Sequence, residues 1–180
     1  MRKLYFTAAA ATALFTATGA GADSFQHTVS LSATAPHVCS FGGTPPGHTG
    51  TFADGITAGS SSLAVTVGAE NIAAQVATLT FANVFCNGNN TTVRLQKGGL
   101  KVSAATQTAP GFKKEIEYEA SVEWGGIPIV SLGAGETDVP TNIGAMTGDL
   151  VLKIEVPAST GPFVADTYND SLVLTVLPTT

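Results

Sequence analysis

The chain is poor in charged residues, and it lacks the basic surface that binding to polyanions requires. Lysine and arginine together number 8 against 13 acidic residues, which gives a net charge of −5 at pH 7. The absence of a basic patch argues against nucleic acid and anionic lipid surfaces as partners. Hydrophobic residues make up 44% of the sequence, a fraction that is too high for a disordered chain.

Short catalytic and metal-binding motifs are missing as well. No GxSxG elbow, SxxK frame or GK[ST] phosphate loop occurs in the sequence. The three histidines, His27, His37 and His48, have spacings that match no metal motif. Alternate glutamates over 115–123 could supply paired carboxylates, but a charged outer strand face is the commoner arrangement. We therefore expect no enzyme activity, no cofactor and no metal site.

A long apolar run is present only at the N-terminus, and it has the form of a secretory signal. Arg2 and Lys3 precede the apolar run Leu4–Phe15, and Ala20-Gly21-Ala22 fits the small-residue rule for cleavage. The apolar run is about half of the roughly 20 residues needed to cross a bilayer, so an uncleaved anchor is the weaker alternative. We expect removal of residues 1–22 and a mature chain that begins at Asp23, exported through the periplasm.

The chain has two cysteines, Cys39 and Cys86. In an exported protein an even number of cysteines favours a disulfide. A disulfide that closes the loop between Cys39 and Cys86 would contribute about 4 kcal/mol of stability in the chain-entropy model. Metal binding by two free thiols is the alternative, but no CxxC or HxxxH spacing accompanies them.

The mature chain has the pattern of strands and turns, with eight or nine alternating segments and no convincing helix. Residues 115–124 alternate most clearly, with the glutamates facing out and a set of larger residues facing in, namely Ile116, Tyr118, Ala120, Val122 and Trp124. Residues 76–86 and 91–96, joined by Asn-Gly-Asn-Asn, predict a hairpin. Further strands are expected over 127–132, 149–156 and 168–177, and a loop over 133–147. The pattern is typical of an all-β antiparallel sandwich over 36–180.

The first segment of the mature chain, 25–35, also alternates. Phe25, Val29, Leu31 and Ala33 share one face with the polar His27, and the other face is polar throughout. A strand at the free end of a chain can pair within its own sandwich or pair elsewhere. The pattern by itself leaves both arrangements open.

The C-terminal segment 165–176, ADTYNDSLVLTV, resembles the closing strand of the spore coat protein U family, which includes pilin subunits of the archaic chaperone–usher pathway. Members of that family end in a small residue, then Tyr-x-Asp, then an alternating strand. Tyr168 and Asp170 hold the motif positions, and the buried face continues through Leu172, Leu174 and Val176. The N-terminal half is similar too, because Cys39 is followed by Gly42-Gly43 and Cys86 by Asn87-Gly88.

The resemblance implies an incomplete, immunoglobulin-like pilin domain that lacks its last strand. A groove beside the closing strand, formed here by Tyr168, Asp170, Leu172, Leu174 and Val176, would accept a strand from a periplasmic chaperone and later from the next subunit. Residues 23–35 would be that donor, with Phe25, Val29, Leu31 and Ala33 as the inserted side chains. The implied partners are like subunits, a chaperone and an outer-membrane usher, and the implied product is a surface pilus with a role in adhesion or biofilm.

Two other interpretations remain open at this point. A glycan-binding module or tip adhesin would use aromatic residues such as Phe112, Tyr118 and Trp124 as a sugar platform. A hydrolase on a β-sandwich is the third, and no motif in the sequence favours it.

Overall fold

The computed structural model describes residues 32, 35–41, 47–50, 54–56, 61–62, 65–68, 70–102 and 110–179, and the unit described below spans Ala35–Thr180. The described residues contain no helix, and all pairings between named strands are antiparallel. None of the described residues therefore lies in a helix long and apolar enough to cross a membrane. The predicted all-β, antiparallel fold class is confirmed.

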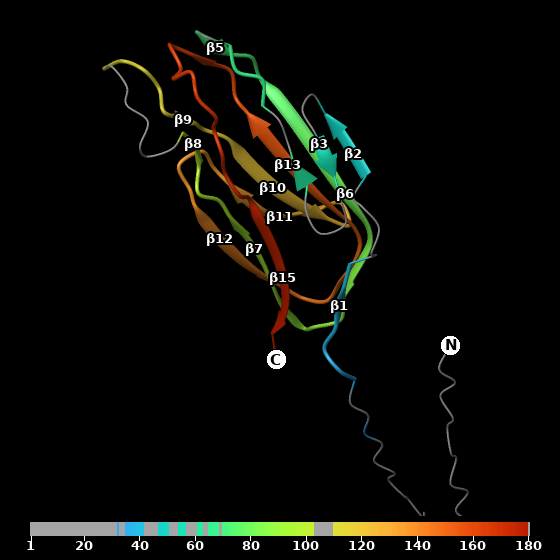
Figure 1. Cartoon of the computed structure of the whole chain (residues 1–180). Helices are drawn as coiled ribbons and strands as arrows, with labels where there is room; N and C mark the ends of the chain where they lie inside the picture. The colour runs from blue at the N-terminus through green and yellow to red at the C-terminus, as the bar shows by residue number, and fades with distance from the viewer. Residues whose placement is uncertain are drawn as a thin grey trace, which may run out of the picture. The chain divides into compact units, whose positions relative to one another are not determined.

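Two sheets carry most of the fold (Figure 1). The larger has the order β1 (Cys39–Ser40), β6 (Gln75–Cys86), β13 (Met146–Val156), β10 (Glu119–Trp124) and β11 (Ile127–Leu132), and β2 (Gly47–Gly50) also pairs with β6. The smaller has the order β12 (Asp138–Ile143), β7 (Asn90–Gln96) and β15 (Val173–Thr179). Three short ribbons pair β3 (Asp54–Ile56) with β4 (Ser61–Ser62), β5 (Asn71–Ile72) with β14 (Ser159–Thr160), and β8 (Leu100–Lys101) with β9 (Glu115–Ile116).

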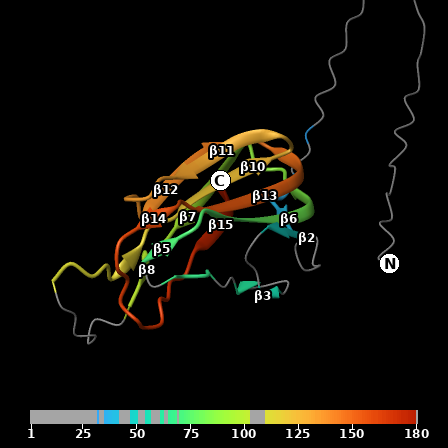
Figure 2. The same ribbon diagram turned by 90° about the horizontal axis from the view of Figure 1, so that it is seen from above.

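The core lies between the two sheets (Figure 2). Period-2 alternation directs every second side chain of β13 and β10 inward, and in β6 the alternation shifts by one residue around 81–83. The inward side chains of the three strands meet Val93 and Leu95 of β7 in one cluster. Val93, Leu95 and Trp124 are 0% exposed. All five residues predicted to face in over 116–124 are buried, and Glu115, Glu117, Glu119 and Glu123 are exposed, as predicted.

The predicted hairpin between 76–86 and 91–96 is wrong. β6 and β7 belong to different sheets, so the link 87–89 crosses from one layer to the other. Each strand presents an apolar face, and an arch lets these two faces meet across the core, whereas a hairpin would place both on one sheet. Turn residues such as Asn-Gly serve either connection, which is why the sequence did not distinguish them.

Two further boundaries differ from expectation. The loop predicted over 133–147 contains β12, whose Pro140 is tolerated because β12 is an edge strand of the smaller sheet. The strand predicted over 168–177 begins only at Val173, and Tyr168 and Asp170 lie in the segment that leads into it.

Four chain segments meet at one end of the sandwich. Cys39 pairs with Cys86 at the end of β6, and Thr179 pairs with Asn90 at the start of β7, only a short link away. Figure 1 shows β1 beside the end of β15, and these two strands are in contact. The chain therefore enters its first strand at the same end at which its last strand finishes.

The disulfide between Cys39 and Cys86 is present, as predicted, and it ties β1 to β6 at this end. We expect the double substitution Cys39→Ser/Cys86→Ser to lower the free energy of unfolding by about 2–4 kcal/mol, because the open chain recovers loop entropy when it unfolds. Urea denaturation of the variant should match that of the wild type in reductant. Equal midpoints for oxidised wild type and variant would contradict this expectation.

Candidate functional site

The outer edge of β15 is the most unusual surface of the sandwich. Within the described residues β15 pairs with β7 alone, so the backbone groups along its other side have no strand partner there. Its segment Val173–Leu177, VLTVL, carries no charge and no proline. An uncharged, apolar edge strand is a template for pairing with another chain.

Two of the other outer strands, β11 and β12, are protected in the usual way. β11 carries Pro128 and β12 carries Pro140, and proline removes a donor from an edge ladder. The two strands also contact each other, so the chain itself bridges the sandwich on that side. β15 has a proline only near its last residue, at Pro178.

The inner face of β15 is incompletely covered. Leu172, Leu174 and Val176 pack against the core but remain partly buried, whereas Val93 and Leu95 on the adjacent β7 are 0% exposed. Both sets of side chains face the same core, so the difference reflects missing neighbours on the open side of β15. Three of the five predicted acceptor residues, Leu174 and Val176 on β15 and Leu172 just before it, therefore share one partly covered face.

Large apolar side chains are exposed around the end of this edge. Leu177 is 53% exposed, and on the facing sheet Val38, Phe41 and Phe85 are exposed to a similar degree. The Phe41 ring lies edge-on to Phe81, with 6.0 Å between the ring centroids. Leu177 points outward from the smaller sheet and Phe85 points outward from the larger one, so these side chains do not form one continuous patch at the edge.

Asp170 fixes the start of β15. Its carboxylate accepts hydrogen bonds from the backbone N–H groups of Gly98 (2.9 Å) and Gly99 (3.0 Å) and from the Tyr118 hydroxyl (2.5 Å). These bonds join the segment before β15 to the end of β7 and to the start of β10. The aspartate of the Tyr-x-Asp motif thus holds the partly covered strand against both sheets.

Tyr168 anchors the same segment further upstream. Its hydroxyl lies 3.0 Å from the carbonyl oxygens of both Lys113 and Val164, so it can donate to either. Neither motif residue lies on β15 itself. Their positions indicate that the motif orients the strand, while Leu172, Leu174 and Val176 supply its apolar face.

The electrostatics of this anchor follow from its burial and its donors. Burial alone raises the pKa of Asp170, but the hydrogen bonds from Tyr118, Ser171, Gly98 and Gly99 together outweigh burial and hold the pKa below its ordinary value. Burial and the bond to Asp170 both raise the pKa of the Tyr118 hydroxyl. The ionised carboxylate and the neutral phenol are therefore the stable pair at neutral pH.

Lys97 completes the network and is only 6% exposed. Its ammonium group donates to the carbonyl oxygens of Tyr118 and Gly133, the latter at 2.8 Å, and lies 4.5 Å from the centroid of the Tyr118 ring. Burial lowers the pKa of Lys97, and the nearby carboxylates of Asp170 and Glu119 oppose that shift only in part. Because its buried charge is held by these hydrogen bonds, Lys97 has a structural role, unlike a lysine exposed on the surface.

A pocket of about 540 Å³ lies where the segment leading into β15 passes the ribbon of β8 and β9. Its lining is mostly apolar, with Val65, Val67, Leu100, Ile116 and Phe163 among the contributing side chains, and Asp166 and Tyr168 add polar atoms. The pocket thus lies at the opposite end of β15 from the disulfide.

The remaining sequence candidates have different outcomes. The proposed donor residues Phe25, Val29, Leu31 and Ala33 lie outside the described residues, as does His27, and only the backbone of His48 is described. In the described part of the chain, no three His, Cys, Asp or Glu side chains gather as a metal-ligand set. The proposed aromatic sugar platform is not formed, because Trp124 and Tyr118 are buried in the core and only Phe112 is exposed.

Sequence reasoning missed the partners of Asp170, although two signals for them were present. Alternation along Thr91, Val93 and Leu95 places Lys97 on the inner face, and an inward Tyr118 requires a hydrogen-bond partner for its hydroxyl. That these side chains meet near Asp170 depends on how the two sheets pack.

Leucine-to-alanine substitutions should lower the free energy of unfolding more on β7, whose inner side chains are buried, than on β15, whose inner side chains are only partly buried. We expect Leu95→Ala to cost about 2–5 kcal/mol of unfolding free energy, because a cavity forms in a closed core. The same change at Leu174 should cost less than half as much in the isolated chain, because that side chain is only partly buried. Chemical denaturation of both variants measures this, and equal losses would show that the face of β15 is fully covered.

The Asp170 anchor should weaken in acid. A pKa held below the ordinary 3.8 means that the ionised group stabilises the fold above pH 4, and that this contribution is lost as the pH falls through the depressed value. We expect Asp170→Asn to cost about 1–2 kcal/mol at pH 7 and progressively less below pH 4. Glu117→Gln, a change at an exposed glutamate, is the control; a pH-independent difference for Asp170→Asn would contradict the assignment.

No protein-family model, curated protein or solved structure matches the chain, so the function of this open edge must be argued from its own geometry and motifs.

Proposed function

We propose that this protein is a non-enzymatic structural subunit of a bacterial surface fibre, assembled by donor-strand exchange. In this proposal the domain is an incomplete, pilin-type immunoglobulin-like sandwich, and residues 23–35 of one copy complete the sandwich of the next. Export through the periplasm, a strand-donating chaperone and an outer-membrane usher follow from the same proposal, as does an adhesive or biofilm role for the fibre.

The observation that carries the proposal is the condition of β15. It combines an edge without a strand partner among the described residues, an uncharged VLTVL sequence and an inner face that stays partly exposed. One added strand would remedy all three, because it would pair with the edge and cover the face. The resemblance of 165–176 to the closing strand of spore coat protein U proteins supports the same interpretation.

Strand directions favour a donor from another molecule. β1 begins at the end of the sandwich where β15 finishes, so the chain's own segment 25–35 could lie along β15 only by reversing just before β1. It would then run parallel to β15, a pairing that is slightly less stable per residue than an antiparallel one. A segment from a second copy can pair antiparallel without any reversal.

The expected gain from such a joint is large. Burying Phe25, Val29 and Leu31 contributes about 1.5–3 kcal/mol for each side chain, and each backbone hydrogen bond adds about 0.5–1.5 kcal/mol. A joint with several of each would dissociate very slowly. That stability suits a fibre exposed to the medium better than it suits a reversible binding module.

Complementation between two defective chains tests the proposal. A mature chain with Val29→Asp and Leu31→Asp should have a poor donor segment and an intact acceptor strand. A chain with Val176→Glu should have an intact donor segment and a poor acceptor strand. We expect neither chain to polymerise after refolding. An equimolar mixture should give heterodimers with one joint each, measured by light scattering after size exclusion.

Matched controls introduce the same charges away from the joint. Ser30→Asp and Ser32→Asp lie on the polar face of the donor segment, and Ile127→Glu lies at a 55% exposed position of β11. All three should polymerise as the wild type does. A wild-type mature chain that stays monomeric with and without a chaperone, or a mixture that forms no heterodimer, would refute the proposal.

A further inference from the structure

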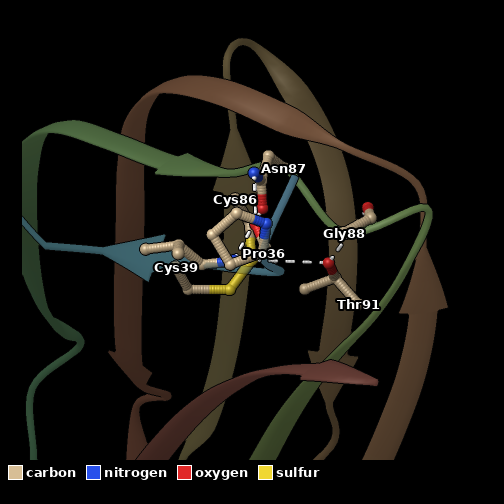
Figure 3. Close-up of a disulfide and its surroundings, with 7 residues drawn as sticks. Pro36, Cys39, Cys86, Asn87, Gly88 and Thr91 are labelled. Carbon is tan, nitrogen blue, oxygen red and sulfur yellow. Dashed lines mark hydrogen bonds between the residues drawn. A yellow bond between two sulfur atoms is a disulfide. The ribbon is translucent and has the colours of Figure 1, made fainter. Parts of the chain in front are cut away.

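The point where the leading segment enters the sandwich is held by one side chain. Asn87 follows Cys86 directly, and its backbone N–H donates to the carbonyl oxygen of Val38 at 3.1 Å. Its side-chain oxygen accepts from the Val38 N–H at 2.6 Å, and its side-chain amide donates to the Pro36 carbonyl at 2.9 Å (Figure 3). Within the part of the chain that the structure describes, Asn87 is the hydrogen-bond partner of both Pro36 and Val38.

These three bonds continue the ladder of β1 beyond the last backbone pair. Cys39 is opposite Cys86, so Val38 is opposite Asn87 in the same register. Beyond that point the chain of β6 turns away into the link 87–89. The Asn87 amide stands in for the missing peptide group, because it offers one acceptor and two donors on a planar frame.

The clasp, defined as Asn87 with Pro36 and Val38, therefore holds the entering chain straight. Pro36 restricts the preceding residue to extended conformations, which stiffens the path further. Ala35, Pro36, His37 and Val38 are all exposed, so core packing does not fix their direction.

Gly88, the residue after Asn87, lies against the end of the open strand. A Cβ placed on Gly88 would meet Pro178 of β15 at 3.5 Å and the Thr91 hydroxyl at 3.1 Å. Thr91 is itself fully buried, and its hydroxyl is within 3.4 Å of both Cys86 Sγ and the Gly88 carbonyl (Figure 3). The residues that hold the entering chain and the end of β15 thus form one packed unit.

We infer that Asn87 is a positioning residue that keeps the leading segment from reversing onto its own β15, and so reserves that edge for another copy. This inference rests on the proposed strand exchange. It adds a reason why the segment would pair with another copy rather than with its own chain. A reversal within Pro36–Val38, directly before β1, would bend these residues out of line and break their bonds to Asn87. Without the clasp the segment is tethered beside its own edge, where its effective concentration is high.

Peptide capture by the refolded mature chain tests this. The probe is a fluorescent peptide with the sequence of residues 23–35, added during refolding at high dilution and followed by anisotropy. The wild type should capture it. Asn87→Ala should capture it with roughly tenfold lower apparent affinity if about nine in ten chains close on themselves, because the available fraction scales the affinity.

Rescue distinguishes positioning from simple damage to the fold. Adding Val29→Asp and Leu31→Asp to Asn87→Ala removes the competing segment, so capture should return to the wild-type level. Asn87→Asp retains the acceptor for Val38 but loses the donor to Pro36, so its apparent affinity for the peptide should lie between those of the wild type and Asn87→Ala. Asn87→Asp also replaces Asn87→Ala in the test if the alanine variant does not fold. Asn142→Ala, which removes an exposed acceptor for the Thr92 hydroxyl on β12, is the matched control and should capture normally.

The outcomes separate the inference from the proposed function. Normal capture by Asn87→Ala, or reduced capture that the donor substitutions do not restore, overturns the positioning role and leaves strand exchange standing. No capture by the chain with Asn87 intact and Val29→Asp/Leu31→Asp overturns strand exchange itself, and the positioning role with it.

Discussion

The structure depends on one unmet requirement, which is the need of β15 for a second neighbour. An antiparallel sheet satisfies the backbone groups of a strand from both sides, and a sandwich covers an apolar face with side chains on all sides. β15 has β7 on one side, and the described residues provide no strand on the other. Along Val173–Leu177 this edge has neither the charges nor the proline that usually protect an outer strand.

The fold compensates by fixing the strand at both ends. At its start, Asp170 is held by Gly98, Gly99 and Tyr118, and Lys97 stacks on the same tyrosine. At its finish, Pro178 packs near the link that follows the disulfide. A strand anchored in this way can keep its register while one edge stays open, which pre-organises it for the incoming segment that we propose.

The disulfide end combines two tasks. The disulfide Cys39–Cys86 holds the first strand on the larger sheet. The hydrogen bonds of the Asn87 side chain to Val38 and Pro36 extend this pairing beyond the strand. The entry of the chain and the end of β15 therefore lie together. We propose that the direction of the entering chain contributes to the specificity of assembly. Under the strand exchange that we propose, Asn87 would influence which molecule completes the sandwich.

Local pattern was enough to predict most of the longer strands and their inward faces, because alternation along one strand depends only on that strand, but it missed β12. The burial of Ile116, Tyr118, Ala120, Val122 and Trp124 and the all-β class follow from it. The pairing of the two cysteines follows instead from their even number in a chain expected to be exported. The crossing of the link 87–89 between sheets, the meeting of Lys97 and Tyr118 with Asp170, and the clasp at Asn87 did not follow from the sequence. They arise where segments distant in sequence come together, and only the packing of the two sheets decides which residues meet there.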